Sequence, residues 1–266
     1  MKGKHVLITG ASGGVGIITA LEFLKIGANV TLQYNSNSTS LQPLKEKYQS
    51  RVCLLKADVT DESQVAGLVS KAVQQLGNIE SLIVCHGIWP SKDVLVKDMD
   101  YKQWRNTLAI NLDGAFLFIK HFLRQITMDM DAPSIVLIGS TAGKFGEAYH
   151  ADYSCSKTAM MYGLISSLKN EVVKIHPRAR INTVSPGWIR TPMAERAMKD
   201  PSLLYQALAS SPLKKVSEPN DIAQAILFLA DSTKSGNITG VSLDVNAGME
   251  GRLLNQPSDF GIKSKL

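Results

Sequence analysis

The chain has 266 residues, of which 44% are hydrophobic and 20% charged, the composition of an ordinary globular protein. Its net charge of +6 comes from scattered basic residues that form no dense run, which argues against nucleic-acid binding. No apolar stretch reaches the roughly 18 residues of a membrane helix, and the few cysteines (Cys53, Cys85 and Cys155) show no metal or redox spacing.

Short β-branched runs alternate with longer amphipathic segments along the chain. Segments such as 62–76, 101–125 and 151–174 are long enough for helices and keep apolar residues at helical spacing. This alternation is typical of right-handed βαβ units in a parallel sheet that is covered on both faces. We therefore predict one doubly wound α/β domain over residues 1–250, with no cleaved signal peptide because the first strand starts near Met1. Its seven candidate strands are 6–9, 30–34, 52–56, 82–85, 135–139, 181–185 and 241–245.

A glycine-rich turn follows the first strand and leads directly into an apolar helix pattern. Gly10, Gly14 and Gly16 let the backbone turn tightly and approach a bound group, while the helix dipole favours an anion. Ser12 and Val15 belong to the same turn. Such a turn can be purely structural, but its place between the first strand and the first helix favours the pyrophosphate of a dinucleotide.

The end of the second strand bears on which dinucleotide is bound. A carboxylate at this place commonly binds the ribose hydroxyls of NAD, and the sequence has none there. Asn35, Ser36, Asn37 and Ser38 offer hydrogen bonds to a 2′-phosphate instead, so we expect NADP(H) to be preferred over NAD(H). The lack of Arg or Lys among them leaves an unselective polar loop as the alternative.

The middle of the chain holds a candidate set for proton transfer. Ser140 closes the fifth candidate strand, Tyr153 follows thirteen residues later, and Lys157 stands at i+4 from the tyrosine, which places the pair on one helix face. A neighbouring ammonium lowers the pKa of a phenol from its ordinary value near 10. Tyr153 is therefore a candidate general acid, although a Tyr-Lys pair alone can also be surface decoration.

Together these motifs resemble the short-chain dehydrogenase/reductase family, from about Lys4 to Gly248, and especially its 3-oxoacyl reductase-like carbonyl reductases. The resemblance implies a Rossmann fold, a nicotinamide cofactor, a small carbonyl or alcohol substrate and a homo-oligomer, either a dimer or a tetramer. The matching motifs beyond the glycine turn are Asp58-Val59, Asn111-Leu112-x-Gly114, Ser140, Tyr153-x-x-x-Lys157 and Pro186-Gly187-x-Ile189-x-Thr191.

The resemblance also implies a role for each of these residues. Ser140, Tyr153, Lys157 and Asn111 form the catalytic set, in which Asn111 supports a proton relay from Lys157 to solvent. Tyr153 and Lys157 also contact the cofactor, and Lys157 holds its nicotinamide ribose. The other implied cofactor contacts are Asp58 and Val59 at the adenine, and Pro186, Gly187, Ile189 and Thr191 near the nicotinamide and the phosphates.

One turn departs from the family pattern. The family commonly has Asn-Asn-Ala-Gly after the fourth strand, whereas this chain has Val84-Cys85-His86-Gly87 and keeps only the glycine. We expect Gly87 and His86 near the cofactor. His86 either touches the cofactor or fills the space of a smaller residue, and we favour the second interpretation.

Large side chains are expected around the catalytic pocket, where they favour a substrate with an apolar portion beside its carbonyl over a polyol. Each could also serve only packing, as we expect for Trp104 in a helix. Segment 191–215 is rich in Met and Leu, is bounded by prolines and is predicted to be a substrate lid. The candidate substrate residues are Trp89, Tyr149, His150, Trp188 and Met193.

The segment 251–266 is polar and is predicted to be an exposed tail. It ends in Ser264-Lys265-Leu266, which matches the address that the peroxisomal import receptor reads. The sequence therefore predicts a peroxisomal protein that binds this receptor. The alternative is a cytoplasmic protein with an accidental ending.

The expected activity is transfer of a hydride to a ketone or aldehyde, with no metal, membrane or nucleic-acid partner. One alternative is a peroxisomal 3-oxoacyl-CoA or 2-enoyl-CoA reductase. Another is a dinucleotide-binding regulator without turnover, against which the complete catalytic set of Asn111, Ser140, Tyr153 and Lys157 argues. A structural or nucleic-acid-binding role would need a basic face that the sequence does not display.

Overall fold

The computed structural model describes residues 1–194, 198–199 and 201–251. Each strand in the first half of the chain is followed by a helical segment, as the alternating pattern predicts. The elements of this half are β1 (His5–Thr9), α1 (Gly14–Lys25), β2 (Asn29–Tyr34), η1 (Thr39–Leu41), α2 (Gln42–Tyr48), η2 (Gln49–Arg51), β3 (Val52–Lys56), α3 (Glu62–Leu76) and β4 (Ile79–Val84).

The second half continues the alternation with longer helical segments. Its elements are η3 (Val96–Asp98), α4 (Tyr101–Leu108), η4 (Ala109–Asp113), α5 (Gly114–Arg124), β5 (Ser134–Ile138), α6 (Thr141–Phe145), α7 (Ala151–Thr158), η5 (Ala159–Leu164), α8 (Ile165–Ile175), β6 (Arg180–Pro186), α10 (Pro201–Ala209), α11 (Pro219–Ala230), α12 (Ser232–Ser235) and β7 (Ser242–Val245).

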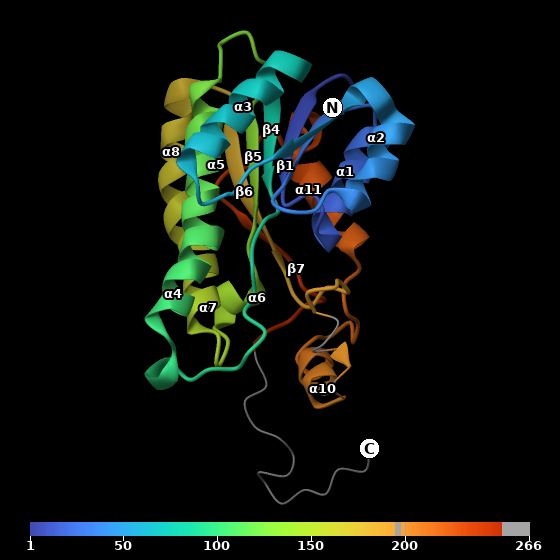
Figure 1. Ribbon diagram of the computed structural model, residues 1–266. Coiled ribbons are helices and arrows are strands. Elements are labelled where there is room, and N and C mark those ends of the chain that lie inside the picture. The colour runs from blue at the N-terminus through green and yellow to red at the C-terminus, as the bar shows by residue number, and fades with distance from the viewer. Residues whose placement is uncertain (195–197, 200, 252–266) are drawn as a thin grey trace, which may run out of the picture.

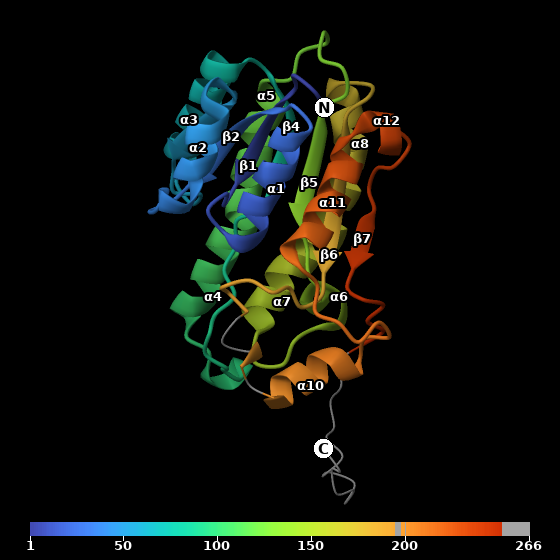
Figure 2. The same cartoon turned by 90° about the vertical axis from the view of Figure 1, so that its right-hand side faces the viewer.

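The strands form one parallel sheet in the order β3-β2-β1-β4-β5-β6-β7. Helices α3, α5 and α8 cover one face, and α1 and α11 cover the other (Figures 1 and 2). The predicted doubly wound, seven-stranded fold is confirmed. No described helix is long and apolar enough to span a membrane.

The sheet separates two hydrophobic cores, because successive side chains of a strand point to opposite faces. In β1, Leu7 belongs to the core beneath α3 and α5, whereas Val6 and Ile8 belong to the core beneath α1 and α11. With both faces buried, the strands are nearly continuous apolar runs. Access to the sheet is therefore left at the ends of its strands.

Two of the predicted helices are interrupted near their centres. A π-helical segment, η4, separates α4 from α5, and a second one, η5, separates α7 from α8. π-Helical turns are often found at functional sites. Here η4 contains the buried Asn111, and η5 begins two residues after Lys157.

The centre of the sheet has the topology of a ligand-binding switch point. The chain goes from β1 to β2 on one side and later pairs β4 with β1 on the other side. In open α/β sheets, ligands bind beyond the carboxyl ends of the strands at such a point. Helix α10, in the segment predicted to be a lid, lies beyond this end of the sheet (Figure 2). The predicted tail lies outside the described residues except for Gly251.

Candidate active site

The turn between β1 and α1 has room only for glycine at three positions. Gly10 has φ +58°, and a Cβ on it would lie 2.6 Å from Cα of His86. A Cβ on Gly16 would lie 2.5 Å from the carbonyl oxygen of Gly10, and one on Gly14 would lie 2.8 Å from Cγ2 of Thr191. The turn is therefore packed against its neighbours through its backbone, as close approach of a ligand to the main chain requires.

Helix α1 begins at this turn without a side-chain cap. Its N-cap residue is Gly13, and its first turn carries no acidic residue. Ser12 and Gly13 are exposed, and Gly14 and Val15 are half-buried. The N-terminal N–H groups and the helix dipole favour an anion here, so these residues fit the pyrophosphate of a dinucleotide.

Gln33, at the end of β2, supports the turn from within the protein. Its side chain is 1% exposed; Oε1 accepts a hydrogen bond from the Gly10 N–H at 2.7 Å, and Nε2 donates to the Ala57 carbonyl at 2.8 Å. Its own carbonyl accepts from the Ala11 N–H at 2.9 Å. Sequence reasoning missed this role because it considered the strand end only for cofactor selectivity.

The residues expected at the adenosine end follow β2 and β3. Asn35, Ser36 and Asn37 are exposed, and Ser38 is half-buried, so this loop can meet a bound group without rearrangement of the core. Asn37 Oδ1 accepts from the Thr39 N–H at 2.8 Å.

After β3, Asp58 is half-buried and its Oδ1 accepts from the N–H of Thr60 at 2.9 Å and from its hydroxyl at 2.7 Å. Val59 is 7% exposed and packs in the core beneath α3 and α5. Asp58 thus lies partly exposed beyond the end of β3, where a bound group could reach it, whereas the side chain of Val59 is used mainly in core packing.

Helix α7 brings the predicted tyrosine and lysine together. Nζ of Lys157 lies 5.7 Å from the centroid of the Tyr153 ring. Lys157 is 4% exposed and donates a hydrogen bond to the carbonyl of Ile138, at the end of β5, at 2.8 Å. Burial lowers the pKa of Lys157 to about 8. A cation is therefore held next to the phenol ring, within the protein.

Asn111, in η4, connects the loop after β4 with helix α7. Its Oδ1 accepts from the Ile88 N–H at 2.8 Å, and its Nδ2 donates to the Ile88 carbonyl and to Ser156 Oγ, both at 3.0 Å. The Ser156 hydroxyl donates in turn to the Tyr153 carbonyl at 2.7 Å. Asn111 and Lys157 are neighbours, since a Cβ on Gly87 would lie 3.2 Å from Asn111 Oδ1 and 3.6 Å from Lys157 Nζ.

His86 lies behind the glycine turn. Thr9 Oγ1 accepts from the N–H of Cys85 at 3.1 Å and lies 2.7 Å from Nδ1 of His86. We therefore assign the Thr9 hydroxyl as the donor to Nδ1, which leaves the imidazole proton on Nε2. Burial, and then the charge of Lys157, lower the pKa of His86 to about 3. A Cβ on Gly114 would lie 2.9 Å from Nε2. This neutral, tightly packed ring favours the space-filling interpretation over a cofactor contact.

The segment after β6 closes against the rest of the site. Pro186 is buried, and the Gly187 N–H donates to the Val245 carbonyl at 3.2 Å. A Cβ on Gly187 would lie 3.2 Å from Cα of Asn246. Thr191 contacts the glycine turn, since a Cβ on Gly14 would lie 2.8 Å from its Cγ2. Two segments that are distant in sequence therefore meet at the predicted cofactor site.

A pocket at this end of the sheet contains much of the predicted site. Ser140 lies two residues after the end of β5 and caps α6 by accepting from the Ala142 N–H at 3.1 Å. It shares the pocket with Tyr153. The other predicted residues that line it are Gly187, Ile189, Thr191, Trp89, Trp188 and Met193; the lining residues that were not predicted are Thr141, Glu147 and Ala194.

Two predicted substrate residues do not line this pocket. His150 is 3% exposed and packs against Trp89, with ring centroids 4.5 Å apart. Tyr149 is 48% exposed and has φ +70°. Of the unpredicted lining residues, Thr141 directly follows Ser140, and that adjacency was the available signal. Among the described residues, no group of three or more His, Cys, Asp or Glu could hold a metal ion.

Comparison with known proteins gives one family match and several full-length relatives. Residues 10–250 match the family model described as Enoyl-(Acyl carrier protein) reductase. The chain is 32% identical over 252 residues to a 3-oxoacyl-acyl-carrier-protein reductase of Thermotoga maritima, a match that covers 94% of this chain and 98% of that protein. It is 29% identical over 253 residues to an L-rhamnose 1-dehydrogenase (NAD(P)(+)) of a Sphingomonas species, with 94% and 97% covered.

A solved structure shares both the fold and this level of identity. A short-chain dehydrogenase/reductase from Brucella melitensis, described as a glucose/ribitol dehydrogenase, superposes with a TM-score of 0.84 and 30% identity. The match covers 94% of this chain and 97% of that one.

Proposed function

Since this chain belongs to the short-chain dehydrogenase/reductase family, we propose that it reduces a ketone or aldehyde to an alcohol with NADP(H). One observation carries the proposal. Ser140 and Tyr153 line the same pocket, and the buried Lys157 lies beside the tyrosine ring. This is the arrangement that a carbonyl oxygen needs in order to be positioned and protonated.

Each residue of the set has a task that follows from its chemistry. When bound, the cofactor supplies the hydride that the carbonyl carbon accepts. The Tyr153 hydroxyl donates a proton to the carbonyl oxygen, and the Ser140 hydroxyl donates a hydrogen bond that directs this oxygen toward the phenol. The Lys157 ammonium favours the ionised phenol that results. Asn111 fixes Ile88 and helix α7 around this lysine.

The preference for NADP(H) rests on the loop after β2. Asn35, Ser36 and Asn37 are exposed there, and no carboxylate stands among them to repel a 2′-phosphate.

We propose that segment 191–215, which contains helix α10 (Pro201–Ala209), acts as a substrate lid. At the start of this segment, Thr191 contacts the glycine turn and Met193 lines the pocket.

A thioester substrate is the second candidate, and the likeness to a 3-oxoacyl-acyl-carrier-protein reductase favours it. The two candidates predict different substrates for the same chemistry. A turnover screen of purified protein with NADPH and NADH, using free ketones, aldehydes, 3-oxoacyl-CoA and 2-enoyl-CoA esters, separates them. A protein without turnover on any of these would contradict both and favour a dinucleotide-binding regulator.

The mechanism is tested by Tyr153→Phe. This variant keeps the ring but loses the proton donor, so kcat should fall by at least roughly 10²–10⁴-fold while cofactor binding is retained. Tyr162→Phe, which alters a tyrosine that is 46% exposed on η5, is the matched control and should retain kcat. Near-normal turnover by Tyr153→Phe would overturn the assignment of the proton donor.

We also propose that Ser264-Lys265-Leu266 directs the protein to peroxisomes, as their sequence predicts. These residues lie outside the described part of the structure. The test compares an N-terminal fluorescent fusion of the chain with the same fusion lacking the last three residues. Puncta that coincide with a peroxisomal marker and become diffuse on truncation would support the proposal. Diffuse signal from both fusions would place the protein in the cytoplasm.

A further inference from the structure

Two indole rings form one side of the pocket. Trp89 comes from the loop after β4, and Trp188 comes from the segment after β6. Their ring centroids are 6.4 Å apart, and their planes are 74° apart. Because the rings meet edge to face, a third ring cannot insert between them. They form instead two adjoining flat walls, which we call the aromatic corner.

The aromatic corner lies in the same pocket as the groups that bind the carbonyl. Ser140 and Tyr153, together with Thr141 and Thr191, provide hydroxyls to this pocket, and Ile189 and Met193 add apolar surface. A ligand is thus bound at its oxygen by hydroxyls and along its body by flat or flexible apolar side chains. Sugar hydroxyls facing the indoles would lose hydrogen bonds to water without replacement.

We propose that this corner makes the enzyme selective for carbonyl compounds that carry an aromatic ring next to the carbonyl group, an inference that rests on the carbonyl reductase function proposed above. A planar ring can pack on one indole face and present its edge to the other, which are the two arrangements that aromatic pairs prefer. A linear acyl chain can offer neither contact. It also loses more rotamer freedom when it is bound.

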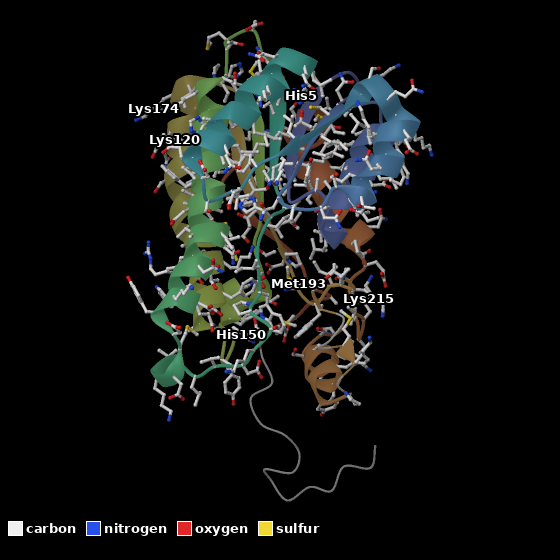
Figure 3. All side chains as sticks on the ribbon, viewed as in Figure 1. His5, Lys120, His150, Lys174, Met193 and Lys215 are labelled. Carbon is white, nitrogen blue, oxygen red and sulfur yellow. The ribbon has the colours of Figure 1, made fainter. Side chains whose placement is uncertain are left out.

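The orientation of Trp89 is fixed from behind. The His150 ring lies 4.5 Å from the Trp89 ring at 39°, and His150 Nε2 lies 3.2 Å from Oδ1 of Asp93 in the loop that carries Trp89. His150 is 3% exposed and precedes α7, the helix of Tyr153. Figure 3 shows His150 and Met193 toward the same end of the molecule, opposite His5. The position of Trp89 is therefore coupled to the helix that carries the proton donor, and a rigid wall favours a rigid ligand.

The test compares two methyl ketones with the same number of carbon atoms, acetophenone and 2-octanone. With NADPH, the unmodified protein should show a kcat/KM for acetophenone that is roughly 3- to 10-fold the value for 2-octanone, the range that an aromatic pair contributes. Trp188→Leu should abolish this ratio, and Trp89→Leu provides an independent variant if the first fails to fold. Trp104→Leu, in α4 and away from the lining residues, is the control that should keep the ratio.

Binding provides a second readout that does not depend on turnover. Titration calorimetry of both ketones into protein saturated with NADP⁺, which cannot reduce them, should show tighter binding of acetophenone and loss of this difference in Trp188→Leu. Equal or tighter binding of 2-octanone to the unmodified protein would overturn the proposal. Selective binding of acetophenone without turnover of either ketone would uphold the aromatic corner and contradict the reductase function.

Discussion

Lys157 is a buried cation that hydrogen-bonds a backbone carbonyl. Its Nζ donates to Ile138, and burial lowers its pKa to about 8. Both forms of such a lysine are accessible near neutral pH, as a group that exchanges protons during turnover requires. The i, i+4 spacing in the sequence was enough to place Lys157 beside Tyr153, because a single helix turn fixes that contact.

Asn35 is the residue at which cofactor preference is best tested. Asn35→Asp places a carboxylate at the exposed end of β2, where it would repel a 2′-phosphate and accept hydrogen bonds from the free ribose hydroxyls. The ratio of kcat/KM with NADPH to that with NADH should fall by roughly tenfold or more, since unit charges at contact distance near a surface interact by about 1–4 kcal/mol.

The matched control is Asn170→Asp on α8, which changes the net charge equally at an exposed position outside the site. Its cofactor ratio should equal that of the unmodified protein. An unmodified protein that uses NADH as well as NADPH would contradict the proposed preference, whatever the variant does.

Some residues of the site could not be placed from the sequence. His150 was expected in the pocket, but it packs behind Trp89 and approaches Asp93, 57 residues away along the chain. Its neighbour Tyr149 has a left-handed backbone conformation, so its side chain does not take the direction expected from an extended chain. Such loop side chains are oriented by tertiary contacts, which carry no periodic signal in the sequence.

Helices α4 and α5 show where a periodic pattern stops being informative. The apolar spacing of 101–125 is that of one helix, and the extra residue of η4 shifts the helical faces where Gly114 follows, without a proline to mark it. The shift accompanies the two hydrogen bonds between Asn111 and the backbone of Ile88. From the sequence, a role for Asn111 was predicted only by resemblance to the family. The structure shows that Asn111 lies in a π-helical turn.

The three strand ends beneath the glycine turn are joined by Gln33. Gln33→Met keeps the length and much of the volume of this buried side chain but leaves the Gly10 N–H and the Ala57 carbonyl without their partner. The free energy of unfolding should fall by about 1–3 kcal/mol for each buried group left unpaired. Because Gly10 belongs to the predicted pyrophosphate site, the Kd of the cofactor should rise as well. Urea unfolding and calorimetric titration with NADPH measure the two effects.

Gln74→Met is the control for this change, since Gln74 is exposed on α3, away from the glycine turn and from the loop after β2. It should alter neither stability nor cofactor binding appreciably. A Gln33→Met protein with lower stability but unchanged cofactor affinity would show that Gln33 supports the sheet and not the turn.

The whole fold was the most predictable feature of the molecule. Alternating β-branched and amphipathic segments favour a parallel sheet covered by helices, since this arrangement buries the apolar sides of both. Strand limits were less accurate: β4 begins at Ile79, three residues before the predicted start. The Gln125 side chain bonds both the N–H and the carbonyl of Ile79, and this contact across 46 residues leaves no local trace in the sequence.

Two buried histidines make the stability of the whole molecule depend on pH. His5 is 2% exposed and His86 is 8% exposed. Burial lowers the pKa of His5 to about 4, and burial together with the charge of Lys157 lowers that of His86 to about 3, both from 6.5. Between these values and 6.5, the unfolded chain binds protons that the folded chain does not. Stability should therefore be lost as the pH falls below about 6.5.

Each histidine should contribute a slope of about 1.4 kcal/mol per pH unit between roughly pH 6 and pH 4. His86→Ala removes one of these groups, so the free energy of unfolding, measured with urea at several pH values in this range, should depend less steeply on pH by that amount. The cavity left by the missing ring lowers stability by a similar amount at every pH and does not affect the slope. Phe23→Leu, which creates a cavity under α1 but removes no titratable group, is the control and should keep the slope of the unmodified protein. If His86→Ala keeps that slope too, then His86 is not the neutral, space-filling ring behind the glycine turn that the structure shows.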